Sequence, residues 1–399
     1  MTAWMQSDFH KNWLMAQANQ LFDFFQFSSI NPNGGFHELG AAGEVIGSIR
    51  QIHSTTRMVH CFAIGHLLGR PGSSDLVDHG MNYIWNTHRD QKYGGYVWSL
   101  NDDGVVDSSK QAYGHAFVLL AAASAKCVAH PLADKMLADV SEILDTRFWE
   151  AQHGAQAEEF AQDWSGRSLY RGQNSNMHLT EALMAAFEVT GESGFLAKAE
   201  SIASLIIGKH AASLGYRVAE HFDENWNVDF DYKGSDMFRP AGTTPGHWLE
   251  WSRLLLQLWE LGGRKLQWLP GVAAELFRSS INLGWDHVRG GFHYTLDWKN
   301  NVALSQKIWW PATEGIGAAA FLSAHNSDPY FAQWYQRIWD FSTTHLIDRK
   351  NGGWLSELDK DLKPTQHFFN GKPDIYHALQ ACLIPLFPAT GSVTNALRS

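Results

Sequence analysis

Arg289-Gly290-Gly291-Phe292 is one of six glycine–aromatic turns whose spacing decides the fold of this chain. The others are NGGF at Gly34-Gly35, YGGY at Gly94-Gly95, SLGY at Gly215, NGGW at Gly352-Gly353 and a weaker QHGA at Gly154. They recur about every 60 residues, with one longer interval before Gly291, and a fixed period of this kind marks a repeat architecture. The sequence therefore predicts six similar units.

Between the turns the apolar pattern is helical. From Pro131 onward, apolar residues keep an i, i+3, i+4 spacing, which is typical of an amphipathic helix. Asp328-Pro329 supplies a capping residue and a proline for the first turn of another helix. The segment 178–210 is interpreted as two helices interrupted at 190–194. Each unit is therefore a helix pair followed by a glycine–aromatic turn.

Six helix pairs can form an open solenoid or close into a double ring. The terminal repeats of a solenoid usually differ from the central ones, whereas here the first and last turns match the others. We therefore expect an all-α fold, an (α/α)6 barrel with one pocket at its axis. Alternating residues such as 292–296 predict short β-hairpins at the loop end. No linker interrupts the period, so 1–399 is predicted to be one domain, with a loose tail at about 389–399.

Composition excludes several classes of function. The chain is 45% hydrophobic and 18% charged, has 18 Trp, and carries a net charge of −10. No basic stripe is present, which argues against a nucleic-acid partner. No signal peptide and no apolar run long enough for a membrane span are found. Three widely separated cysteines give no disulfide or zinc pattern, so the cytoplasm is the expected location.

Polar residues stand at the predicted starts of several helices. His247 and Glu250 are three residues apart and share one helix face, where a carboxylate would raise the basicity of the imidazole. Matched positions in other units hold His178, Glu314 and His377, and Arg57 joins them from the first unit. In a closed barrel these starts meet at one mouth. A single histidine is usually structural, but its repetition at matched places points to a shared site.

Two competing chemistries are open from the pattern alone. Histidine and carboxylate are metal ligands, although no HExxH motif is present. A glycosidase would need two carboxylates on either side of the scissile bond, and Glu250 and Glu314 could supply them. Outside catalysis, a sugar-binding module would bind a monosaccharide without turnover. No phosphate-binding glycine loop occurs, which argues against nucleotide use.

Taken together, these segments resemble the N-acylglucosamine 2-epimerase family, closest to its aldose–ketose isomerase branch. The motifs that carry the resemblance are Arg57-Met58, Asn174-x-Asn176-Met177-His178, Thr244-Pro245-Gly246-His247-Trp248-x-Glu250-Trp251, Trp310-Pro311-x-x-Glu314 and Asp374-Ile375-Tyr376-His377, supported by Glu220-His221-Phe222-Asp223. The resemblance runs from about residue 10 to about residue 388. The family has an (α/α)6 barrel fold, in agreement with the repeat count.

The resemblance implies proton transfer through a cis-enediol without metal or cofactor. His247 and His377 would be the acid/base pair. In the first assignment His377 moves the proton between carbons 2 and 1 and His247 opens the ring; the reverse assignment is the alternative. Arg57 would stabilise the enediolate oxygen. The remaining expected roles are hydrogen bonding to the sugar by His178, tuning of the histidines by Glu250 and Glu314, and pocket walls formed by Asn174, Tyr113 and Trp310.

The implied substrate is an unmodified hexose. Sulfosugar enzymes of this branch carry extra polar residues where this chain has Met237, Ser356 and Pro373. We therefore expect interconversion of D-mannose and D-fructose, with D-lyxose and D-xylulose as a second pair. A sulfoquinovose isomerase, or a mannose or cellobiose 2-epimerase on the same fold, is the alternative. The sequence leaves a monomer and a homo-oligomer equally open.

Overall fold

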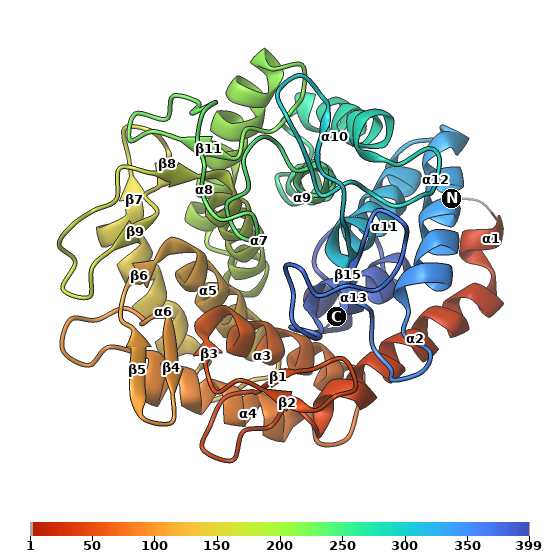
Figure 1. The fold of residues 1–399 in the computed structure, drawn as a ribbon. Coiled ribbons are helices and arrows are strands. Elements are labelled where there is room, and N and C mark those ends of the chain that lie inside the picture. The colour runs from red at the N-terminus through yellow and green to blue at the C-terminus, as the bar shows by residue number, and fades with distance from the viewer. Residues whose placement is uncertain (1–2, 399) are drawn as a thin grey trace.

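The computed structural model describes residues 3–398, and its centre is a ring of inner helices (Figure 1). These inner helices are α3 (Ile52–Leu67), α5 (Ala112–Cys127), α7 (Gln173–Thr190), α9 (Pro245–Leu261), α11 (Trp309–His325) and α13 (Tyr376–Leu383). Almost every residue of α5, α9 and α11 is buried, as expected for helices that are enclosed on all sides.

A second ring of helices surrounds the first. Its members are α2 (Asp8–Gln26), α4 (Ser73–Tyr83), α6 (Ala133–Ile143), α8 (Ser193–Ala203), α10 (Trp268–Ser279) and α12 (Pro329–Phe341). The last inner helix, α13, packs against the first outer helix, α2, and Tyr335 on α12 hydrogen-bonds His10 on α2 at 2.8 Å. The two ends of the chain thus close the ring. The predicted (α/α)6 barrel is confirmed.

Outer helices end in the glycine–aromatic turns. Five of them first continue in π-helical turns, which span Ile84–His88, Leu144–Phe148, Ser204–Ala211, Ser280–Gly284 and Ser342–Leu346. Gly291 has φ +76°, and a Cβ there would lie 2.5 Å from the Phe341 ring, so only glycine fits. Asp90 accepts hydrogen bonds from the amides of its own turn and pairs with the buried Lys110 at 2.9 Å. The same arrangement recurs at the turns of Gly291 and Gly353, in the pairs Asp286–Lys307 and Asp348–Lys372.

Short antiparallel strands connect neighbouring units at the loop end. They are β1 (Glu38–Leu39), β2 (Val45–Ile46), β3 (Arg50–Gln51), β4 (Ser99–Asn101), β5 (Gly104–Asp107), β6 (Lys110–Gln111), β7 (Trp149–Glu150), β8 (Ala155–Gln156), β9 (Glu159–Phe160), β10 (Arg171–Gly172), β11 (His221–Phe222), β12 (Thr295–Leu296), β13 (Val302–Leu304), β14 (Lys307–Ile308) and β15 (Glu357–Leu358). Strands β3, β6, β10 and β14 each lead directly into an inner helix and pair with a strand of the following unit. The N-termini of the inner helices are therefore fixed to one another at this end.

The C-terminal segment differs from the prediction of a loose tail. After the 3₁₀ turn Ile384–Leu386, residues Val393–Arg398 form helix α14, which contacts α3, α5 and α7. The amide of Ser392 donates to Glu188 near the end of α7 at 2.9 Å, and the Ser392 hydroxyl accepts from the Asn395 amide. This short capped helix lies at the C-terminal ends of the inner helices, opposite the strands, where it covers the core. The remaining element is α1 (Ala3–Gln6). Among the described helices, none is long and apolar enough to cross a membrane.

Candidate active site

The structure places all nine predicted site residues within the first six positions of inner helices. Arg57 lies on α3, Tyr113 on α5, Asn174 and His178 on α7, His247 and Glu250 on α9, Trp310 and Glu314 on α11, and His377 on α13. Helix N-termini carry a partial positive charge, and six of them meet here. The arrangement therefore favours negative charge at the mouth of the ring.

His377 is held by a buried carboxylate. Its Nδ1 lies 2.8 Å from Glu314 Oε1, and the second oxygen of Glu314 accepts from Arg253 at 3.4 Å. Burial alone would raise the pKa of Glu314, but Arg253 and then His377 lower it below the ordinary value. An ionised Glu314 can only accept, so it holds the proton of His377 on Nδ1. In the neutral imidazole, Nε2 then carries the free lone pair.

His247 has a different carboxylate partner from the one expected. Its Nδ1 lies 2.9 Å from both oxygens of Glu220, which directly precedes β11, rather than against Glu250. Gln173 donates to Glu220 at 2.8 Å, and Trp251 donates to the oxygen of Gln173 at 2.8 Å. Because an indole N–H only donates, Trp251 fixes the orientation of the Gln173 amide. The expectation that Glu250 tunes His247 is therefore wrong.

The indole of Trp310 contacts both imidazoles. Its ring centroid lies 4.9 Å from that of His247, nearly parallel to it, and 6.0 Å from that of His377. The two histidines come from helices α9 and α13, which are far apart in sequence, yet they share one aromatic neighbour. All three residues are buried, so a substrate between them would be largely shielded from water.

Arg57 provides a fixed cation at the same mouth. Its guanidinium donates to Asp374 at 2.8 Å and to the Tyr113 hydroxyl at 2.7 Å, and it lies over the Phe117 ring. Burial would lower the pKa of Arg57, but Tyr113 and Asp374 raise it overall. The guanidinium is therefore always charged. Asp374 was part of a recognised motif but was not among the predicted site residues.

His178, Glu181 and Glu250 form a third group, with one ligand atom of each within 4.8 Å of the others. The Nδ1 of His178 lies 3.6 Å from Glu250 and 3.9 Å from Glu181. Imidazole and carboxylate are suitable metal ligands, but both oxygens of Glu181 are engaged, one by Arg253 and one by the Tyr376 hydroxyl. A divalent cation here would also lie beside the Arg253 guanidinium, so the group fits a metal poorly.

Several polar atoms of the mouth lack a partner among the described residues. Among them are Nδ1 of His178, Oε1 of Glu250 and Oδ1 of Asn174, all three of which are buried and make no hydrogen bond to the described residues. Burial lowers the pKa of His178 to about 4, so this imidazole is neutral near pH 7. Buried polar groups are nearly always hydrogen-bonded. These three atoms are therefore the groups that a polyhydroxylated ligand would satisfy.

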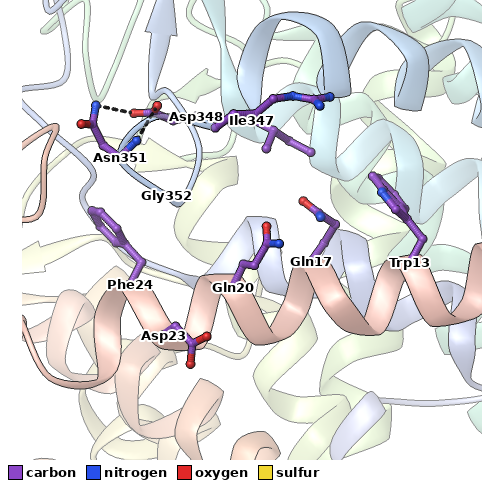
Figure 2. A pocket seen from close by; sticks show the side chains of 10 residues that line it. Trp13, Gln17, Gln20, Asp23, Phe24, Ile347, Asp348, Asn351 and Gly352 are labelled. Atoms are coloured by element: carbon purple, nitrogen blue, oxygen red, sulfur yellow. Dashed lines mark hydrogen bonds between the residues drawn. The ribbon is translucent and has the colours of Figure 1, made fainter.

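A separate cavity of about 530 Å³ lies on the outside of the ring, between α2 and the turn that follows α12 (Figure 2). Trp13, Gln17 and Gln20 line one side, and Ile347 and Asp348 the other. It contains none of the residues at the mouth. The Asp348 carboxylate that borders it is already bonded to Lys372 and to Asn351.

Comparison with known proteins adds independent information. The family model described as N-acylglucosamine 2-epimerase matches residues 34–381. The chain is 39% identical to a D-mannose isomerase of Pseudomonas cannabina pv. alisalensis, over 99% of this chain and 97% of that protein. It is 38% identical to a D-mannose isomerase of Thermobifida fusca, over 100% and 99% of the two chains.

Solved structures of similar proteins share the fold of this chain. A crystal structure of a D-mannose isomerase superimposes with a TM-score of 0.90 at 33% identity, over 97% of this chain and 99% of the other. A cellobiose 2-epimerase from Spirochaeta thermophila has a TM-score of 0.82 at 21% identity, over 94% and 95% of the two chains. The second likeness concerns the fold alone.

Proposed function

Because the chain belongs to the N-acylglucosamine 2-epimerase family, we propose that it is an aldose–ketose isomerase that interconverts D-mannose and D-fructose. The observation that carries this proposal is the pair of imidazoles next to Trp310, each bonded through Nδ1 to a buried carboxylate. Such a pair suits two successive proton transfers, one on carbon and one on oxygen.

His377 is the base for the carbon-bound proton. Its free Nε2 takes the proton from C2 of the open-chain sugar, the C2–H electrons form the C1–C2 double bond, and the carbonyl electrons move to oxygen. The enediolate then takes the same or an exchanged proton at C1 to give the ketose. Glu314 favours this step, because its negative charge stabilises the imidazolium that forms.

His247 handles the protons on oxygen. It donates a proton to the ring oxygen and takes up the proton of the C1 hydroxyl, which opens the ring to the aldehyde. It then donates a proton to O1 of the enediolate and takes up the proton of O2. Arg57, fixed by Asp374 and Tyr113, lies at the same mouth and stabilises the enediolate charge. Each positioned proton-transfer group contributes about 10²–10⁴-fold to the rate.

A monosaccharide is thus the proposed partner of this site, and the cytoplasm is the proposed location. The three cysteines are free in the structure, which supports a reducing compartment.

The test uses the EDTA-treated protein with D-mannose in D₂O, followed by proton NMR. We expect D-fructose with solvent deuterium at C1. His377→Asn is expected to lower kcat by at least about 10²-fold, whereas His66→Asn, an exposed histidine at the other end of α3, leaves it unchanged. D-glucose in place of D-fructose would mean 2-epimerisation, and activity that needs restored metal would overturn the mechanism.

A further inference from the structure

Three carboxylates surround a single guanidinium at the centre of the ring. Arg253 on α9 is buried and donates to Glu181 and to Glu314, each at 3.4 Å. Glu250 is 1% exposed, yet its Oε1 accepts no hydrogen bond from any described residue. Among the three, Glu250 is therefore the carboxyl group without a donor.

Burial and the Glu314 carboxylate raise the pKa of Glu250 more than the two nearby guanidinium groups, Arg253 and Arg57, lower it. Arg57 is bonded to Asp374, and His178 is neutral near pH 7 because burial lowers its pKa to about 4. The ionisable groups around Glu250, taken by helix, are Arg57 on α3, Tyr113 on α5, His178 and Glu181 on α7, Arg253 on α9, Glu314 on α11, and Tyr376 and His377 on α13.

Burying an ionised carboxylate without a partner costs several kcal/mol, and such a group usually takes up a proton instead. Glu181 is stabilised as an anion by Arg253 and the Tyr376 hydroxyl, and Glu314 by Arg253 and His377. Oε1 of Glu250 receives no such hydrogen bond from the described part of the chain, so among the three carboxyl groups Glu250 is the one that a proton stabilises most.

We propose that Glu250 is a neutral carboxylic acid at the working pH of the enzyme and donates a hydrogen bond to an oxygen of the sugar, a role that rests on the proposed isomerase function. In the free enzyme its carboxyl group faces the unpaired Nδ1 of His178 at 3.6 Å. Burial, and after it the Glu314 carboxylate, raise the pKa of Glu250 well above its ordinary value. Glu220 and Glu314 have lowered pKa values instead and act as ionised acceptors.

The protonation state decides what Glu250 can do during the reaction. An ionised Glu250 would repel the enediolate that forms at the same mouth, and it could only accept from sugar hydroxyls. A neutral acid adds no negative charge and can donate to a hydroxyl or to the anionic oxygen. Glu250 would thus be a catalytic residue of a different kind from the carboxylates that orient the two histidines.

Amide substitutions separate the two kinds of carboxyl group. Glu250→Gln keeps the shape, the neutral charge and an N–H donor, so we expect kcat/KM within about 10-fold of the wild type. Glu314→Gln and Glu220→Gln are the matched controls, because each removes an anion from an imidazole and should cost about 10²-fold or more. Glu250→Leu removes the donor and should cost about 10²–10³-fold. A loss in Glu250→Gln as large as in Glu314→Gln would overturn the proposal.

Infrared difference spectroscopy tests the protonation state without turnover. At neutral pH the wild-type minus Glu250→Gln spectrum should contain the C=O stretch of a protonated carboxylic acid, shifted in D₂O. Apart from the amide bands of the new glutamine, the wild-type minus Glu314→Gln spectrum should contain carboxylate bands and no C=O stretch of a carboxylic acid. A carboxylate band in the Glu250 difference spectrum would refute the proposal even if the protein did not isomerise mannose. An acid band in a protein that forms no fructose would leave Glu250 protonated and remove the isomerase function.

Discussion

Arg253→Met is the substitution whose effect follows most directly from the arrangement at the centre of the ring. Methionine replaces the aliphatic part of the arginine side chain, but it removes the only guanidinium bonded to Glu181 and Glu314 among the described residues. Removing one partner from a buried ion pair costs about 3–5 kcal/mol, because the other charge stays buried without compensation.

The expected change in Tm follows from the size of the chain. At about 2.1 cal/mol/K per residue, 399 residues give an unfolding entropy of roughly 0.8 kcal/mol/K. The loss of 3–5 kcal/mol then lowers Tm by about 4–6 °C. Arg278→Met is the control, since Arg278 and its partner Asp328 are both more than a third exposed, and such a pair contributes only about 0–1 kcal/mol.

The loss of Tm in Arg253→Met should also depend on pH, in a direction that follows from the pKa of Glu314. Burial opposes ionisation of Glu314, but Arg253 lowers its pKa overall, so the stability from this group is present above the ordinary pKa of about 4.3 and is lost as pH falls. The Tm deficit of Arg253→Met should therefore be largest at neutral pH and shrink only below about pH 4.3, as the pH falls toward the lowered pKa of Glu314. Calorimetry at pH 7.5 and pH 3.5 measures both values. A deficit no larger than that of Arg278→Met at pH 7.5, or one that grows in acid, would refute the reasoning.

Two further predictions concern the scaffold. Lys110→Met removes the buried cation that pairs with Asp90 in the turn of Gly94-Gly95. Calorimetry should therefore show a Tm that is lower by several °C. An unchanged Tm would show that the ion pair does not stabilise the fold. A chain that stops after Pro388 lacks α14 and should unfold at a lower temperature. Its KM for D-mannose should be unchanged, because α14 packs at the end of the ring opposite the histidines. A raised KM would contradict the separation of α14 from the site.

The fold could be predicted because its repeating element is local. Each glycine–aromatic turn needs a left-handed backbone, and at Gly291 a side chain would also collide with Phe341. These turns therefore require glycine, and the regular spacing of the glycines can be recognised in the sequence. Closure of the ring was inferred from the likeness of the first and last turns. The sequence does not predict helix α14, because six residues are too few to show a helical spacing of apolar residues. Its stability comes from contacts with helices that lie far away in sequence.

The positions of the site residues followed from the repeat, but their pairings did not. His247 and Glu250 are three apart on one helix face, yet the imidazole lies at the third position of α9 and turns toward Glu220, outside the helix. Glu250 lies one turn deeper, toward His178. Side chains of a helix lean toward its N-terminus, so a histidine in the first turn reaches the strands above it rather than the next residue on its own face. The segment that contains Glu220 was noted only as a family match.

The charges at the mouth explain why one of its carboxyl groups has to be neutral. Asp374 is balanced by Arg57, while Glu181 and Glu314 share Arg253, which leaves a net negative charge before any substrate binds. Six helix N-termini, each equivalent to about half a positive charge, offset this charge and provide the field that an enediolate needs. Glu220 is a further anion at the same mouth. A fifth anion at Glu250 would offset the field of the helix N-termini in the free enzyme, where that field contributes nothing to the rate. A protonated Glu250 preserves the field for the transition state, in which the new negative charge develops.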